Sequence, residues 1–475
     1  MSPPTPYRRP RRLLALGAAF LLVIGGGSWS SAGPEADDDQ LSSEDTYPTV
    51  AKDPDLDSHL AEIASTYDEE GSKAARSEAE SSGADVKHQK VRVVLDVEPG
   101  ERAAVEDRIR ELGGEVEGDF AARIQALLPP STIEDAADDA GVRYAHLPEP
   151  AEPQAVTGEG VGVTGADDWH GRGFTGDGVK VAIVDGGFAG FTDRQTEGDL
   201  PAGLTTRNFC ADGFTSETDH GTAVAEILYE MAPDADLFLV CALNAVELGQ
   251  ALTYVKSVGV DIVSRSVGSF NTGRGDGTGG PGTADGIVAD AVRSGILWVN
   301  AAGNHAHSHW GGRFSDADGD DFHNFTPTDE GNTVVMPAGE QLCFALRWDD
   351  WPRSDQDYDL GLHRSSDLAV VAASVDPQTG TQPPTEFLCY TSATTAAYTV
   401  SILKFDATET PRFDLFAVQE LPFEHQVPAG SIVEPASSPD AFAVGAFCWQ
   451  DGSLQSYSSR GPTIDGRTKP DILGP

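Results

Sequence analysis

The chain has 475 residues, with 32 Lys and Arg against 76 Asp and Glu, so its formal net charge is −44 at pH 7. A surface with that excess of carboxylates repels nucleic acid and anionic membranes, and we expect neither as a partner. The 52 Gly and 30 Pro residues follow no regular period, which excludes a collagen-like chain. This length allows roughly two to four domains.

The first 32 residues are typical of an export signal. Arginines between positions 8 and 12 precede an uncharged apolar run over 13–24, and small residues at 30–32 offer a cleavage site. The run is shorter than the roughly 20 residues of a transmembrane helix. We therefore expect a signal peptide at 1–32, no stable membrane insertion, and a secreted, extracellular protein. A signal anchor is the alternative.

Two contrasting segments follow the signal. Residues 33–90 are rich in Ser, Asp and Glu and poor in large apolar residues, which predicts an acidic, mostly disordered linker with a transient helix near 60–63. Residues 91–147 switch between strand and helix periodicity in the order βαββαβ, from the strand VRVVLDV to the strand VRYAHL. That order predicts a small ferredoxin-like α+β domain.

The pattern then becomes a regular alternation of strands and helices. Near-continuous apolar runs such as VKVAIV are typical of parallel strands buried on both faces. They predict an α/β fold with a doubly wound parallel sheet over 155–304. Short alternating segments between turns predict a β-sandwich at 305–422. A buried strand returns near 441–447, so we expect 428–475 to be the second part of the α/β domain and the sandwich to be an insertion.

Three polar residues fall where such a fold gathers its chemistry. The strand VAIV ends at Asp185, a helix opens at His220, and the strand ILWVNAA ends just before Asn304. Active sites of doubly wound sheets lie at the carboxyl ends of the strands. There an Asp can orient a His, the His can move a proton, and an Asn amide can donate to an oxyanion. Each residue taken alone is also consistent with an ordinary turn or helix cap.

The segments VAIVDGGF, DHGTAVAEI and AAGNHA resemble the aspartate, histidine and oxyanion-asparagine motifs of the subtilisin-like serine proteases, in that family's chain order. The resemblance implies a subtilisin-like fold. It also implies that Asp185 orients His220, that His220 is the general base and then the general acid, and that Asn304 is the oxyanion donor.

The resemblance extends to two further segments. Ser266, Val267 and Gly268 resemble the stretch whose backbone pairs with substrate, and 456–475 resembles the segment that leads to the family's serine motif. The partners implied are protein or peptide substrates, with no cofactor required. The domain at 91–147 would then be a propeptide that assists folding and blocks the cleft, lying across the carboxyl edge of the sheet. An ordinary accessory domain is the alternative.

The family also needs a serine in a Gly-Thr-Ser type motif shortly after KPDILGP, and the sequence ends at Pro475. Ser264 and Ser266 belong to the substrate-binding strand. We therefore expect 1–475 to be an inactive partial product of a secreted serine endopeptidase, with a pseudoenzyme as the alternative. The alternative to an enzyme is a non-catalytic secreted binding protein on a protease-like scaffold. A Gly-Thr-Ser-Ala type continuation of the coding sequence would favour the enzyme, and a stop codon the binding protein.

Five cysteines are spread along the chain with no CxxC pair. We expect a disulfide between Cys343 and Cys389, because both lie in apolar strand segments and export permits oxidation. Cys210 and Cys241 are a second candidate pair, which leaves Cys448 as a buried thiol.

One loop suggests a metal ion. Asp316, Asp318 and Asp320 are dense in carboxylates, which suits calcium, although the Gly and Glu of an EF-hand loop are missing from the required positions. A solvated acidic loop is the alternative.

Overall fold

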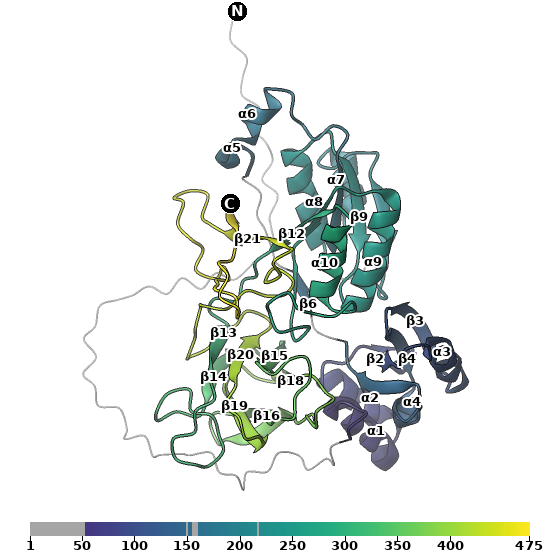
Figure 1. Cartoon of the computed structure of the whole chain (residues 1–475), viewed down its shortest axis with the longest axis vertical. Coiled ribbons are helices and arrows are strands. Elements are labelled where there is room, and N and C mark those ends of the chain that lie inside the picture. The colour runs from purple at the N-terminus through teal and green to yellow at the C-terminus, as the bar shows by residue number, and fades with distance from the viewer. Residues whose placement is uncertain (1–52, 149–150, 154–159, 216–217) are drawn as a thin grey trace, which may run out of the picture. The chain divides into compact units, whose positions relative to one another are not determined.

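The computed structural model describes residues 53–148, 151–153, 160–215 and 218–475, with 151–153 described by their backbone alone. The expected signal peptide at 1–32 lies outside these residues. No helix in the described part of the chain is long and apolar enough to cross a bilayer. Figure 1 traces the chain from end to end.

The N-terminal region, residues 53–148, is built around an antiparallel sheet. The strand order is β1-β2-β4-β3, and β5 also pairs with β2. From β2 onward the elements follow the βαββαβ order that the sequence predicts. The bounds are α1 (Ser58–Glu70), α2 (Ser72–Ser81), β1 (Val86–Lys87), β2 (Lys90–Val97), α3 (Arg102–Glu111), β3 (Glu115–Phe120), β4 (Arg123–Leu128), a 3₁₀ turn (Pro130–Thr132), α4 (Ile133–Ala137) and β5 (Val142–His146).

The prediction of a mostly disordered linker at 33–90 is corrected over 53–90, where helices α1 and α2 form, and residues 33–52 lie outside the described part of the chain. Leu60 and Ile63 of α1 and Ala75 and Ala79 of α2 are buried in the same core as β2 and β4. The prediction counted large apolar side chains, whereas small alanines let α2 approach its neighbours closely. In the described part of the chain, the compact N-terminal region therefore begins well before residue 91.

The α/β region, residues 160–304 and 428–475, contains a parallel sheet of seven strands in the order β22-β21-β12-β10-β7-β9-β8. The bounds are α5 (Gly160–Thr164), α6 (Ala166–His170), β7 (Lys180–Asp185), α7 (Phe191–Glu197), β8 (Thr205–Asn208), α8 (His220–Met231), β9 (Asp236–Cys241), α9 (Ala245–Val258), β10 (Ile262–Arg265), β11 (Val267–Ser269), α10 (Ala284–Arg293), β12 (Leu297–Ala301), β21 (Phe442–Ala446) and β22 (Ile472–Gly474).

Helices cover both faces of this sheet. Helices α9 and α10 share one face, where they pack on Val184 and Val263 (Figure 1). Helix α8 packs on the other face, against Ile183 and Leu239. Alternate residues of each strand thus meet different helices, which explains why these strands are apolar on both faces. The expected doubly wound α/β sheet is present.

The ends of α9 show how local sequence sets an element. The Asn244 side chain accepts hydrogen bonds from the backbone N–H groups of Val246 and Glu247, which caps the first turn. Gly259 ends the helix with a φ of 71°, a conformation that glycine adopts without steric cost.

The intervening region, residues 305–427, contains two four-stranded antiparallel sheets, β13-β20-β15-β18 and β14-β19-β16-β17. Side chains of both sheets, among them Phe344, Leu360, Val400 and Phe413, form one buried core. The bounds are β13 (His309–Arg313), β14 (Asn332–Met336), β15 (Gln341–Trp348), β16 (Asp357–Arg364), β17 (Ala369–Ser374), β18 (Thr385–Thr391), β19 (Ala396–Asp406) and β20 (Arg412–Ala417).

The chain returns to the parallel sheet after the intervening region. Strand β21 pairs in parallel with β12, and β22 pairs in parallel with β21. β21 and β22 therefore belong to the same sheet as β12. The intervening region is inserted in the sequence of the α/β region, but the sheet itself is continuous.

Candidate active site

Asp185 and His220 form a hydrogen-bonded pair at the carboxyl edge of the parallel sheet. Asp185 ends β7 and is fully buried, and His220 opens α8 with 9% of its side chain exposed. His220 Nδ1 lies 2.9 Å from both carboxylate oxygens of Asp185. Because an ionised carboxylate only accepts hydrogen bonds, the imidazole donates from Nδ1 and turns Nε2 away from Asp185. That tautomer is the one in which Nε2 can accept a proton.

The backbone around this pair fixes its geometry. The Gly221 N–H donates to the Gly187 carbonyl over 3.0 Å, and the Thr222 hydroxyl donates to the Ala189 carbonyl over 2.9 Å. A Cβ at position 221 would stand 2.6 Å from the Gly187 oxygen and 2.9 Å from the Asp185 Cβ. Glycine at 221 is therefore what lets α8 start so close to the end of β7.

Arg265 is a functional candidate that the sequence analysis missed. It ends β10, is 1% exposed, and donates to the carbonyls of Ala242 and Leu243 over 2.9 Å each. Burial lowers its pKa to about 10, and the carboxylates of Asp185 and Glu247 act against that shift, so the guanidinium stays charged at neutral pH. The sequence could have pointed to Arg265, because it ends the apolar strand DIVSR. A charged side chain in a strand that is buried on both faces needs polar partners.

The predicted substrate-binding stretch lies in and just before β11. Val267 and Gly268 belong to β11, which pairs antiparallel with β6 (Ala151–Pro153). Ser266 precedes the strand and is 9% exposed. The strand that we expect to bind substrate, β11, therefore pairs with β6, which directly follows the N-terminal region of the same chain.

Asn304 follows a turn that only glycine suits. Gly303 has a φ of 103°, and a Cβ there would stand 2.9 Å from the Ser459 hydroxyl. The same hydroxyl accepts from the His305 N–H over 2.9 Å, which joins the turn to the segment 456–475. Burial raises the pKa of the Glu420 carboxyl, and the neighbouring Asn304 side chain partly offsets that rise.

A cavity of about 650 Å³ lies beside these residues. Ser266 and Asn304 line it, and Val224 and Leu228 of α8 contribute apolar side chains. Ser266, which we expect to bind substrate, and Asn304, the expected oxyanion donor, thus line the same cavity. His220 opens the helix that forms part of its wall but is not itself among the lining residues.

The N-terminal region contacts the α/β region near the carboxyl ends of β8 and β9. Arg92 is 3% exposed and donates to both carboxylate oxygens of Asp212 over 3.0 Å. The Asn244 amide donates to Gln125 over 2.6 Å. Asp212 follows β8 and Asn244 follows β9, so these contacts lie at the edge of the sheet where Asp185 and His220 are found.

Four of the cysteines are joined in pairs. Cys343 is bonded to Cys389, its direct partner in the β15–β18 register, with 4.0 Å between their Cα atoms. Cys210 is bonded to Cys241. The prediction that Cys448 is a buried thiol is wrong, because the residue is partly exposed. It lies in the turn after β21, where the chain has already left the core.

The carboxylates of the acidic loop lie close together, and hydrogen bonds within the loop hold its shape. Oxygens of Asp316, Asp318 and Asp320 lie within 4.8 Å of one another. Asp316 accepts from the N–H groups of Gly319 and Asp321, bonds that shape the loop. Burial, with Asp318 and Asp316 close by, raises the pKa of Asp320. Calcium binding at this loop stays a prediction from the sequence.

Comparison with known proteins finds similarity to subtilases. Residues 176–339 match the family model of the subtilase family. Subtilisin E of Bacillus subtilis (strain 168) is 28% identical over 225 residues, which are 43% of this chain and 56% of subtilisin E. Alkaline elastase YaB of Bacillus sp. (strain YaB) is 28% identical over 203 residues, 40% of this chain and 50% of the elastase. The chain thus spans about half the length of these curated relatives.

Among solved structures, the CspB protease of Clostridium perfringens aligns with a TM-score of 0.43 at 13% identity, covering 65% of this chain and 78% of that one. The epidermin leader peptide processing serine protease EpiP of Staphylococcus aureus aligns with a TM-score of 0.41 at 12% identity, covering 81% of this chain and 74% of that one.

Proposed function

The chain belongs to the subtilase family, and on that premise we propose that it forms most of a secreted serine endopeptidase. The observation that carries the proposal is the bond between Asp185 and His220 at the carboxyl edge of the sheet. The serine of the triad would come from a segment beyond Pro475. Residues 1–475 alone are then inactive.

The proposed reaction divides the work among these residues. The serine Oγ attacks the carbonyl carbon of a peptide bond while His220 Nε2 takes the hydroxyl proton, and His220 then gives that proton to the leaving amine. A water molecule then attacks the acyl carbon in the same way, and the acyl group is released from the serine. Asp185 holds the imidazole and stabilises its charged form, and the Asn304 amide donates to the tetrahedral oxyanion.

The cavity beside Asn304 supports the proposal that the catalytic serine comes from a segment beyond Pro475. It is walled by α8 and by the ends of β10, β12 and β21, and its apolar lining suits a buried helix. In this proposal such a helix fills the cavity and places the serine at its first turn, near His220. The amide of Asn304, which neighbours Glu420, would donate to the oxyanion during the reaction.

The N-terminal region takes the role of a propeptide of ferredoxin-like fold in this proposal. Support comes from the pairing of β6 with β11, since a peptide substrate binds by adding a strand to such an edge. The contacts of Arg92 with Asp212 and of Asn244 with Gln125 would hold the region at the carboxyl edge of the sheet. Cleavage after β6 would then free the edge of β11. The two sheets of the intervening region would form a β-sandwich inserted in the catalytic domain.

The test compares 1–475 with the same chain continued by its natural coding sequence, using a fluorogenic peptide substrate. We expect turnover only from the continued chain, and its loss in His220→Ala. His88→Asn is the matched control, because His88 is an exposed histidine of the N-terminal region. A continuation that ends at once, or one that folds and shows no hydrolysis, would contradict the proposal and favour a binding protein on a protease-like scaffold.

A further inference from the structure

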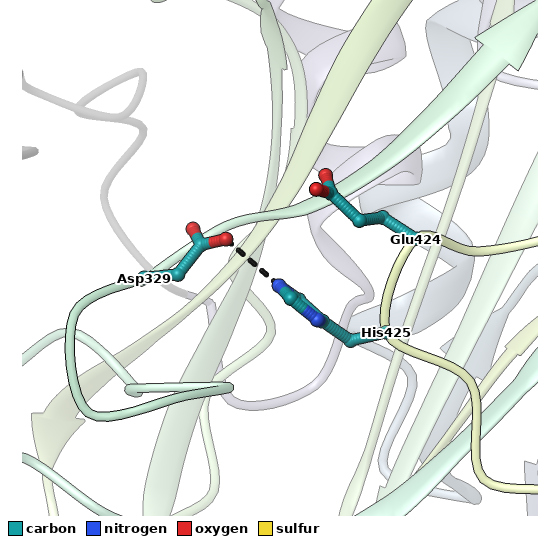
Figure 2. A group of neighbouring side chains, drawn as sticks. All are labelled: Asp329, Glu424 and His425. Carbon is teal, nitrogen blue, oxygen red and sulfur yellow. Dashed lines mark hydrogen bonds and ion pairs between the residues drawn. The ribbon is translucent and has the colours of Figure 1, made fainter. Parts of the chain in front are cut away.

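Asp329, Glu424 and His425 form a cluster in the intervening region. Asp329 lies in the loop before β14, and the other two residues lie in the segment after β20. One carboxylate oxygen of each acid and one ring nitrogen of His425 all lie within 4.8 Å of one another. Figure 2 shows the three side chains close together, with a dashed line for the hydrogen bond between His425 and Asp329. In that bond His425 Nε2 lies 2.7 Å from Asp329 Oδ2.

The backbone of both segments is held in place. Asn332 is fully buried, accepts from the His425 N–H and donates to the His425 carbonyl, over 2.9 Å each. The Glu424 N–H donates to the Thr333 carbonyl over 2.9 Å. These bonds tie the start of β14 to residues 424 and 425. The cluster is therefore set by the fold and does not depend on a chance approach of long side chains.

One carboxylate of the cluster has no partner among the described residues. The bond between His425 and Asp329 accounts for two of the three side chains. The Glu424 carboxylate has neither a hydrogen bond nor an ion pair within the residues that the structure describes, yet it faces a second carboxylate. Two carboxylates at this separation repel each other, so a cation between them would be stabilising.

We propose that Asp329, Glu424 and His425 bind a divalent transition metal ion, with Zn²⁺ the best match. One imidazole nitrogen and two carboxylates are ligands that Zn²⁺ accepts, and three protein ligands leave one position for water. Calcium prefers six to eight oxygen ligands, so the histidine argues against it. Ligands about 2.1 Å from a tetrahedral Zn²⁺ stand about 3.4 Å apart, which small side-chain rotations reach from the observed arrangement.

The bound ion would join two segments that are 96 residues apart in the sequence. One is the loop that enters β14, and the other carries the chain from β20 back to the α/β region. A ligand that binds only the folded state stabilises that state. Zn²⁺ should therefore raise the melting temperature of the protein.

The experiment titrates metal-stripped, tag-free 1–475 with Zn²⁺ and with Ca²⁺ by calorimetry, and records the visible spectrum with Co²⁺. We expect one Zn²⁺ per chain, the intense bands of a four-coordinate Co²⁺ site, and a higher melting temperature with Zn²⁺. His425→Ala and Glu424→Gln should each weaken Zn²⁺ binding at least about tenfold. Glu424 is exposed, so its substitution does not threaten folding.

Matched controls separate this cluster from other acidic groups. Glu340→Gln replaces an exposed glutamate of the same region outside the cluster, and Asp318→Asn removes a carboxylate of the acidic loop. Both should bind Zn²⁺ as the unaltered chain does. No Zn²⁺ binding, Zn²⁺ binding unchanged in Glu424→Gln, or Ca²⁺ binding that is as tight as Zn²⁺ binding and is weakened by Glu424→Gln but not by Asp318→Asn would each overturn the proposal.

Discussion

Asp185–His220 and Asp329–His425 are pairs of the same residue types in different surroundings. Asp185 is fully buried and His220 is held through Nδ1 by both carboxylate oxygens. The side chains of Asp329 and His425 are 40% and 23% exposed, and their bond runs from Nε2 to a single oxygen. The first pair lies at the carboxyl edge of a parallel sheet, and the second lies between loops of the intervening region.

What an Asp–His pair can do depends on the residues around it. With Nδ1 held, the opposite nitrogen of His220 points away from the aspartate, which suits proton transfer. With Nε2 held beside a second carboxylate, His425 is one of three groups that could share a cation. The charged neighbours differ in sign as well, because buried Arg265 acts on Asp185 whereas Glu424 faces Asp329.

Asp185→Asn should give the largest effect and separate the two pairs. In the continued chain we expect kcat to fall about 10⁴-fold, the size known for serine proteases, because an amide no longer fixes the imidazole tautomer. The same variant should bind Zn²⁺ normally in calorimetry. A loss of Zn²⁺ binding in Asp185→Asn would show that the pairs are not independent, and retained hydrolysis would break the assigned role of Asp185.

Arg265→Met tests the charge that distinguishes the first pair. The substitution leaves the buried carboxylates of Asp185 and Glu247 without the guanidinium and the carbonyls of Ala242 and Leu243 without donors. We expect the free energy of unfolding to fall by about 3–5 kcal/mol, measured by urea denaturation.

Arg313→Met is the control for this measurement, because Arg313 is an exposed arginine at the end of β13. Its free energy of unfolding should change by less than about 0.5 kcal/mol. Equal effects of the two substitutions would mean that Arg265 has no special electrostatic role.

Substitutions of Asn304 and Asn332 should have different effects, one on catalysis and the other on stability. Asn304→Ala in the continued chain should lower kcat about 10²–10³-fold, a magnitude measured for the oxyanion asparagine of subtilisin, and should leave stability nearly unchanged. Asn332→Ala should instead lower the free energy of unfolding by about 1–3 kcal/mol, because it leaves partly buried backbone groups of His425 without the Asn332 side chain as a partner. An Asn304→Ala variant with unaltered kcat would remove Asn304 from the proposed mechanism.

Sequence was sufficient where the signals were local. The apolar strand before Asp185 and the glycine after His220 are enough to place both residues at the ends of their elements. The alternation of strands and helices likewise predicted the parallel sheet.

Prediction failed where contacts join distant segments. Nothing in the sequence near Asp329 points to Glu424 and His425, since their meeting depends on how β14 and the segment after β20 pack. The pairing of β6 with β11 and the partners of Arg265 were hidden for the same reason. Helices α1 and α2 were missed because composition rules undervalue buried alanines.

The proposed role of Asp185 and His220 is tested most directly by labelling with a fluorophosphonate probe, followed by mass-spectrometric location of the modified residue. We expect no labelling of 1–475, labelling of the continued chain at a serine beyond Pro475, and loss of that labelling in His220→Ala. Labelling of 1–475 at Ser264 or Ser266 would contradict the claim that Asp185 and His220 act on a serine supplied from beyond Pro475.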